Sequence, residues 1–356
     1  MDHRLIVRTK DGSVETTNGE VIYFSAERFR RDICERGGCF LCGRQREDGD
    51  FNDEHILPRW LLTEYDLFDK TINLPNRTRF SYGRYKITCC SACNALLGKK
   101  IEAPVSQLLR NGYEAVADHI QSEGTQLLYT WLSLIFLKTH LRDQFFRYHL
   151  DLRHGDDQLS RDYDWADFHH THAVARAFFS GCSVEQEALG SFCVFPAATA
   201  PHYEHFDYHD LFLAQSALLR VGDVALLAVF DDGFAALSHR QTFLSRIDGS
   251  LSPVQLREVL AHLAYTNLKL AERPRFYTDF RSRRCTIRAD RPRCVEITEH
   301  EPEMLGQIFH ACVGHFLDHM LNSDLDEIRA NVRAGRYTFL YDANGQFIRN
   351  SLDPAP

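Results

Sequence analysis

The first third of the chain begins with short runs in which apolar and polar residues alternate. Leu5-Ile6-Val7 and Glu20-Val21-Ile22-Tyr23-Phe24 are typical of strands. The pairs Asp11-Gly12 and Asn18-Gly19 between them are turn signals. This pattern predicts a small β-ribbon within residues 1–33, leading into a loop-rich, cysteine-punctuated stretch.

From Asn94 onward the hydrophobic spacing changes to that of helices, and strand-like runs return later. We expect helices from Asn94 to about 109 and over 113–150, 157–181, 253–270 and 301–333. We expect strands at 191–195, 224–230 and 234–237, the last two joined by a hairpin turn at Asp231-Asp232-Gly233, and a hairpin over 336–348. The predicted class is α+β, with a small module at 34–110 and a larger mixed α+β domain at 111–356.

Composition narrows the function classes. The run Leu127–Leu137 is apolar but too short to span a bilayer, and no apolar run follows the first residues, so we expect no membrane segment. The net charge of −8 argues against binding polyanions over the whole surface. Close cysteine pairs without a secretory signal favour metal ligation over disulfides and a reducing cytoplasm.

Four cysteines form two CxxC pairs, Cys39-Phe-Leu-Cys42 and Cys90-Ser-Ala-Cys93. Two such pairs make a tetrahedral thiolate site for structural Zn²⁺. Cys89 is an alternative to Cys90, but only Cys90 leaves two residues before Cys93. Buried, inert cysteines are the other interpretation.

Between the two pairs lies Asp53-Glu54-His55-Ile56-Leu57-Pro58, and Asn94 directly follows the second pair. A neutral His55 can take a proton from water. Glu54 and the amide of Asn94 offer oxygen ligands of the kind that Mg²⁺ prefers. Each has a plainer interpretation: His55 as a turn residue and Asn94 as a helix cap.

Together these motifs resemble the HNH endonucleases, a family with a ββα-metal fold, over about 75 residues. The resemblance implies that His55 is the general base and that Glu54 and Asn94 hold a catalytic Mg²⁺ or Mn²⁺. It also implies a loop asparagine, Asn73 or Asn76 with Asn73 preferred, that orients the catalytic histidine. The chain departs from the family in having Glu before the histidine, Asn at the last position and a long spacing between His55 and Asn94.

Basic residues gather in the same module. Arg77, Arg79, Arg84, Lys86, Lys99 and Lys100 lie in a stretch without acidic residues and are candidate nucleic-acid contacts. A solvated basic loop is the alternative. An arginine-rich strip at 273–293 is either a second nucleic-acid or partner surface or an ordinary pair of exposed strands. The histidines near 169–172 and 202–209 do not form a closed metal-ligand pattern.

The sequence thus predicts a metal-dependent DNA endonuclease with a structural zinc, whose second domain controls access or binds a partner. By analogy, the resemblance implies a cytoplasmic effector of bacterial anti-phage defence, paired with a protein such as a short Argonaute. Its oligomeric state is left open. The alternative is a zinc-knuckle protein that binds nucleic acid or assembles with partners and has no catalytic activity.

Overall fold

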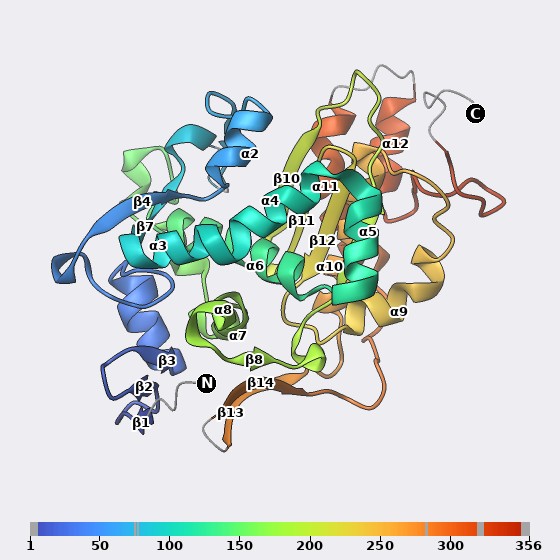
Figure 1. Ribbon diagram of the computed structural model, residues 1–356. Coiled ribbons are helices and arrows are strands. Elements are labelled where there is room, and N and C mark those ends of the chain that lie inside the picture. The colour runs from blue at the N-terminus through green and yellow to red at the C-terminus, as the bar shows by residue number, and fades with distance from the viewer. Residues whose placement is uncertain (1–5, 75, 77, 282–283, 319–323, 350–356) are drawn as a thin grey trace. The chain divides into compact units, whose positions relative to one another are not determined.

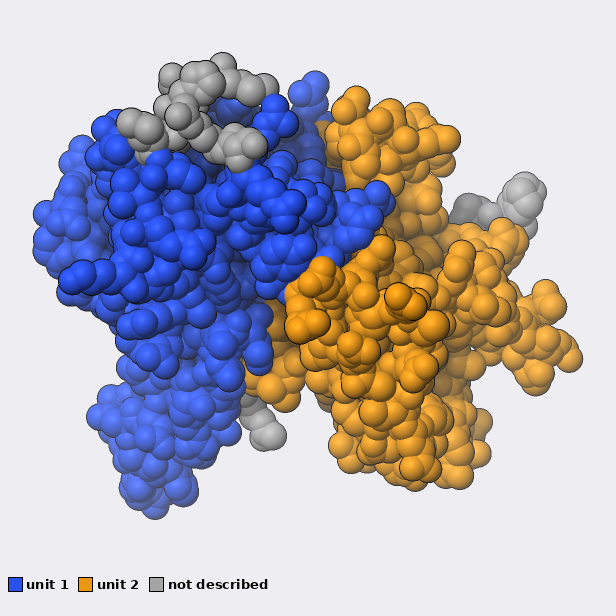
Figure 2. Space-filling model, turned by 90° about the horizontal axis from the view of Figure 1, so that it is seen from below, with its two compact units in different colours: residues 1–107, 126–188, 276–289 blue, residues 108–125, 189–275, 290–356 orange. Residues whose placement is uncertain are grey.

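The computed structural model describes residues 6–74, 76, 78–281, 284–318 and 324–349. Internal contacts divide it into two compact units (Figure 2): unit 1 is residues 1–107, 126–188 and 276–289, and unit 2 is residues 108–125, 189–275 and 290–356. Helices and strands occur in both, which confirms the α+β class. Each unit combines segments that are distant in the sequence. The predicted domain boundaries at residues 33 and 110 divide the chain in sequence order, and they stay a prediction.

The strands of unit 1 form small sheets (Figure 1). They are β1 Ile6–Arg8, β2 Val14–Thr16, β3 Val21–Tyr23, β4 Phe51–His55, β5 Thr71–Asn73, β6 Arg79–Ser81, β7 Lys86–Cys90, β8 Ser183–Val184, β13 Arg275–Arg281 and β14 Arg284–Asp290. The antiparallel sheet β1-β2-β3 is the predicted N-terminal ribbon, with Gly12 and Gly19 at positive φ in its turns. Strands β4 and β7 form a separate antiparallel pair, as do β5 and β6.

The helices of unit 1 are α1 Ala26–Arg28, α2 Arg59–Glu64, α3 Ser91–Leu97, α6 Gln126–Asp143, α7 Trp165–Ala175 and α8 Ala177–Ser180. Helix α4, Ala103–Arg110, crosses the boundary between the units. Nearly every side chain of α6 is buried, so the apolar run Leu127–Leu137 lies in a core helix within the helical region expected at 113–150. Within the described residues, no helix has the length and apolarity that a membrane crossing requires.

Unit 2 is built on an antiparallel sheet in the order β10-β11-β12-β9. Its elements are α5 Gly112–Glu123, β9 Phe192–Pro196, β10 Phe206–Leu211, β11 Ser216–Val221, β12 Val224–Val229, α9 Ala235–Leu244, α10 Pro253–Leu268, α11 Pro302–Leu317 and α12 Leu325–Arg333. Every residue of β11 and β12 is buried, so both faces of the sheet are covered. Helix α10 begins at the expected Ser252-Pro253 cap.

The strand predicted at 234–237 is wrong, because these residues begin helix α9. Asp232 is not part of a hairpin turn: its Oδ2 accepts the backbone N–H of Ala236 at 2.7 Å. The hydroxyl of Ser191 accepts the N–H of Leu237 at 2.8 Å. Two free N–H groups of the first helical turn are thereby satisfied by side chains, which favours a helix over a strand.

The predicted C-terminal hairpin differs in detail, whereas the arginine-rich strip forms a pair of strands, one of the two expected alternatives. The C-terminal hairpin has its turn at Asp342–Gly345 but only an isolated bridge between Tyr341 and Phe347. The arginine-rich strip forms the strand pair β13 and β14, and a disulfide joins Cys285 of β14 to Cys182 before β8. Disulfides are typical of oxidising compartments, so the bond between Cys182 and Cys285 does not support the expected reducing environment.

Candidate functional site

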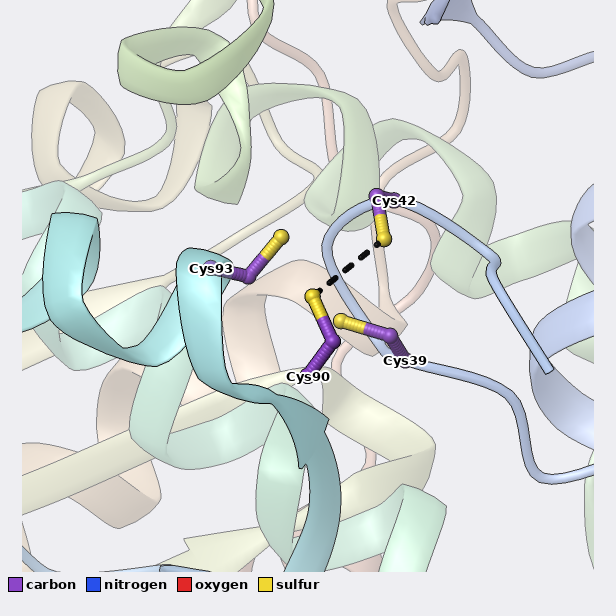
Figure 3. A group of neighbouring side chains, drawn as sticks. All are labelled: Cys39, Cys42, Cys90 and Cys93. Atoms are coloured by element: carbon purple, nitrogen blue, oxygen red, sulfur yellow. Dashed lines mark hydrogen bonds between the residues drawn. The ribbon is translucent and has the colours of Figure 1, made fainter. Parts of the chain in front are cut away.

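Four thiols converge where the loop at residues 39–42 meets the start of α3. Figure 3 shows the side chains of Cys39, Cys42, Cys90 and Cys93 pointing toward one another. Their sulfur atoms all lie within 4.8 Å of one another, and Cys42 Sγ is 3.7 Å from Cys90 Sγ. A tetrahedral zinc with Zn–S bonds of about 2.3 Å requires sulfur–sulfur distances of about 3.8 Å. These four cysteines could therefore hold a metal ion such as zinc.

The structure also distinguishes Cys90 from Cys89, the alternative fourth ligand in the sequence. Cys89 Sγ lies 3.9 Å from Cys39 Sγ, yet Cys89 is not a member of the four-thiol group. Cys34 is buried apart from this group as well. The spacing argument that preferred Cys90, two residues before Cys93, therefore agrees with the geometry.

Helix α7 and the residue after it hold the backbone of the first cysteine pair. His172 Nε2 donates to the carbonyl of Phe40 at 3.0 Å, and Arg176 Nε donates to the carbonyl of Leu41 at 2.9 Å. Burial lowers the pKa of His172 well below its usual value, so its ring is neutral. These contacts fix the two residues between Cys39 and Cys42. This structural role of His172 and Arg176 was not predicted from the sequence.

Two of the other histidines considered as metal ligands, His169 and His170, also have structural partners. His169 and His170 each hydrogen-bond to a backbone carbonyl, that of Phe24 at 2.7 Å and that of Ala188 at 2.8 Å. His209 is buried, which lowers its pKa to about 3. The neighbouring Asp207 accepts hydrogen bonds from Nε and Nη2 of Arg257, one on each carboxylate oxygen. Within the described part of the chain, the four cysteines are the one cluster of three or more metal-ligand residues.

The candidate catalytic residues lie on a strand pair followed by a helix. Strand β4 runs antiparallel to β7, with Glu54 opposite Ile87 and His55 opposite Lys86. Helix α3 follows β7 directly and carries Asn94. The Asn94 amide donates to Asn52 Oδ1 at 3.0 Å, so α3 lies against β4. Residues two positions apart in a strand lie on the same face, so Asn52 shares a face with Glu54. This spacing was the signal in the sequence that could have identified Asn52.

Glu54 is buried and has a cation beside it. Lys138 of α6 places its Nζ 3.2 Å from Glu54 Oε1 and donates to the backbone carbonyl of His55 at 2.8 Å. Only 1% of the Lys138 side chain is exposed. Glu102 is close to the same pair, and burial together with the negative charge of Glu54 raises the pKa of Glu102 to about 7. Lys138 thus fixes both the carboxylate and the backbone of the Glu54-His55 segment.

Replacing Lys138 with methionine is expected to lower the free energy of unfolding by about 3–5 kcal/mol, because a buried carboxylate would lose its counter-ion. Urea denaturation followed by circular dichroism measures this change. Lys10→Met is the matched control, since Lys10 is exposed. Equal stability of the two variants would show that the Glu54–Lys138 pair contributes nothing.

His55 is half-buried at the end of β4, with its ring held by neighbours in the chain. It hydrogen-bonds to the backbone of Gly83, and its ring meets that of Phe68 edge-on at a centroid distance of 6.1 Å. Burial, followed by the charge of Lys86, lowers the pKa of His55 below 6.5. The ring is therefore neutral at neutral pH and able to accept a proton. Gly83 is required sterically, since a Cβ there would lie 2.8 Å from the carbonyl of Phe68.

The two candidate loop asparagines lie elsewhere in the module. Asn76 donates to the carbonyl of Arg147 at 2.7 Å and accepts the N–H of Thr78 at 3.0 Å, which makes it a turn-stabilising residue. Asn73 is exposed at the end of β5. Its role in orienting His55 stays a prediction, whereas the backbone of Gly83 makes the contact with the ring.

The predicted basic residues lie on different elements of the module. Arg79 is exposed on β6, and Lys99 and Lys100 are exposed on the π-helical turn Gly98–Glu102. Arg84 and Lys86 line a cavity together with Arg46 and Arg142, which the sequence did not indicate. Arg77 lies outside the described residues.

Comparisons with known proteins give no relative from which a role could be transferred. No protein-family model, no curated protein and no solved structure matches this chain.

Proposed function

We propose that the chain is a metal-dependent HNH-type endonuclease that hydrolyses phosphodiester bonds in DNA. The observation that carries this proposal is the order of the parts. A strand ending in Glu54-His55 pairs with a strand that leads through the second cysteine pair into a helix bearing Asn94. The four thiols clamp the loop before the first strand to the start of this helix.

In this proposal His55 is the general base. Its neutral ring takes a proton from the attacking water, and the contact with the Gly83 backbone sets the orientation of the ring. Lys138 is a positioning residue, since it holds the carbonyl of His55 and the carboxylate of Glu54. Asn73 remains a candidate for a second orienting contact.

Glu54 and Asn94 would hold the catalytic Mg²⁺ or Mn²⁺, and Asn52 Oδ1, which accepts the Asn94 amide N–H, would position Asn94. These are hard oxygen donors of the type that such ions bind. When bound, the ion would stabilise negative charge on the phosphate and the leaving oxygen. Because Lys138 contacts Glu54, an ion bound there would share the carboxylate with an ammonium group. Zinc bound by the four cysteines would have a structural role only.

The resemblance to HNH proteins also supports a biological context. In this part of the proposal, the predicted domain at 111–356 controls access to the nuclease or binds a partner. The system is bacterial anti-phage defence, and the partner is a protein such as a short Argonaute. This step depends on analogy of sequence motifs.

A second function is favoured by one specific contact. If the ion pair between Glu54 and Lys138 takes the place of a catalytic metal, the module would bind nucleic acid without cleaving it. The zinc site would then stabilise a binding or assembly protein.

Incubation of the purified chain with supercoiled plasmid separates these two functions. The nuclease proposal predicts nicked or linear products after addition of Mg²⁺ or Mn²⁺ and intact plasmid without added divalent ions. Retarded but uncut plasmid under all these conditions would contradict the proposal and support the binding protein. The same assay with RNA and with single-stranded DNA identifies the preferred substrate.

A further inference from the structure

A cavity of about 260 Å³ lies in unit 1 beside strand β7 and the C-terminal turn of α6. This volume is just below the lower end of the range for small-ligand sites, about 300 Å³. Its charged lining comes from Arg46, Arg84, Lys86, Arg142 and Asp53. The cavity is therefore large enough for one small group and strongly cationic.

The positive charge is only partly neutralised within the protein. Arg46 pairs with Asp53 at 2.9 Å. Among the described residues, neither Arg84 nor Lys86 forms an ion pair. The Arg142 guanidinium lies over the Phe146 ring, 4.7 Å from its centroid, and forms no ion pair with a described residue. An anionic ligand would therefore supply the negative charge that these side chains lack, through charge-assisted hydrogen bonds.

The cavity also has an apolar side, formed by Ile33, Leu141 and Phe145. The Phe145 side chain is 42% exposed, although large apolar residues are usually buried. An exposed aromatic ring beside a group of arginines is the combination on which nucleobases stack while their phosphates are bound.

The cavity borders the candidate catalytic residues. Lys86 is the register partner of His55 across the β4–β7 pair. Arg84 follows Gly83, whose backbone contacts the His55 ring. A phosphate bound by these two side chains would lie next to His55, across the β4–β7 pair.

We propose that this cavity binds one nucleotide unit, with its phosphate on Arg84, Lys86 and Arg142 and its base on Phe145. The role of the cavity in placing a substrate rests on the proposed function, but binding itself does not. The nucleotide comes either from the nucleic-acid chain, next to the bond that is cut, or from a free mononucleotide.

Fluorescence anisotropy of a labelled single-stranded oligothymidylate, without added divalent ions, tests the proposal on the full chain. Arg142→Gln and Phe145→Ala are each expected to weaken binding about tenfold, because a charge-assisted contact and a stacking contact are lost. Arg142→Gln should also reduce the slope of log affinity against log salt by about 0.7. Lys10→Gln, an exposed charge in the same unit, is the matched control and should leave the affinity unchanged.

Arg84→Gln is a second test variant that is expected to fold normally. Arg84 is exposed, and its replacement removes no ion pair within the described residues. Wild-type affinity in both arginine variants, or an equal loss in the Lys10 control, would overturn the proposal. Thymidine monophosphate added as competitor identifies the source. Displacement of the oligonucleotide indicates a site for free nucleotides, and no displacement indicates a site for the polymer.

The outcome is separable from that of the proposed function. Binding that depends on Arg142 in a chain that cuts no nucleic acid would support the cavity and contradict the nuclease. Cleavage by a chain whose Arg142→Gln and Arg84→Gln variants bind like wild type would contradict the cavity alone.

Discussion

Replacement of His55 by alanine is expected to reduce the rate of metal-dependent cleavage by about 10²–10⁴-fold, the usual contribution of a general base. The ring is half-buried, and burial lowers its pKa so that it is neutral and able to accept a proton. Its removal takes away one hydrogen bond and one edge-on ring contact, for which we expect a loss of about 1 kcal/mol in stability. The measurement is the initial rate of plasmid nicking at saturating Mg²⁺.

His202→Ala is the matched control, because His202 is an exposed histidine of unit 2. This variant should cut at the wild-type rate. If the His55 variant also cuts at that rate, another residue is the base and the assignment of Glu54-His55 fails.

Replacement of Cys93 by serine is expected to release the bound zinc and unfold the module around it. A neutral hydroxyl is a poor substitute for a thiolate ligand, and metal binding to such sites contributes about 10–16 kcal/mol in small zinc modules. The thiols join the loop at residues 39–42 to the start of α3, so their separation would also release Asn94 from Asn52. Zinc content by elemental mass spectrometry and the thermal unfolding midpoint both report this loss.

Cys294→Ser is the control, because Cys294 is exposed and not disulfide-bonded. It should keep both the zinc and the wild-type melting temperature. Full zinc content in the Cys93 variant would contradict the four-thiol site, and a wild-type preparation without any bound metal would do the same.

The parts that the sequence predicted are those set by short-range pattern. The spacing of the cysteine pairs selected Cys90 over Cys89, and the geometry agrees. The apolar run at Leu127–Leu137 became a buried helix, since a helix that is apolar on all sides has no face for water. The turn glycines of the N-terminal ribbon are likewise local signals.

The parts that the sequence missed depend on residues far apart in the chain. Lys138 lies 84 positions after Glu54, and no local pattern connects a lysine in an apolar helix to that carboxylate. Arg142 and Arg84 line the same cavity but lie far apart in the chain, so no local pattern connected them either. The error at 234–237 arose because the caps for α9 come from Asp232 and from Ser191, which is 46 positions before the N–H that it accepts.

We expect zinc binding and catalysis to use separate residues of one module. The decisive measurement is the zinc content and the cleavage rate of one preparation of the His55→Ala variant. We expect wild-type zinc content with cleavage reduced about 10²–10⁴-fold. Loss of zinc together with activity, or activity at the wild-type level, would contradict it.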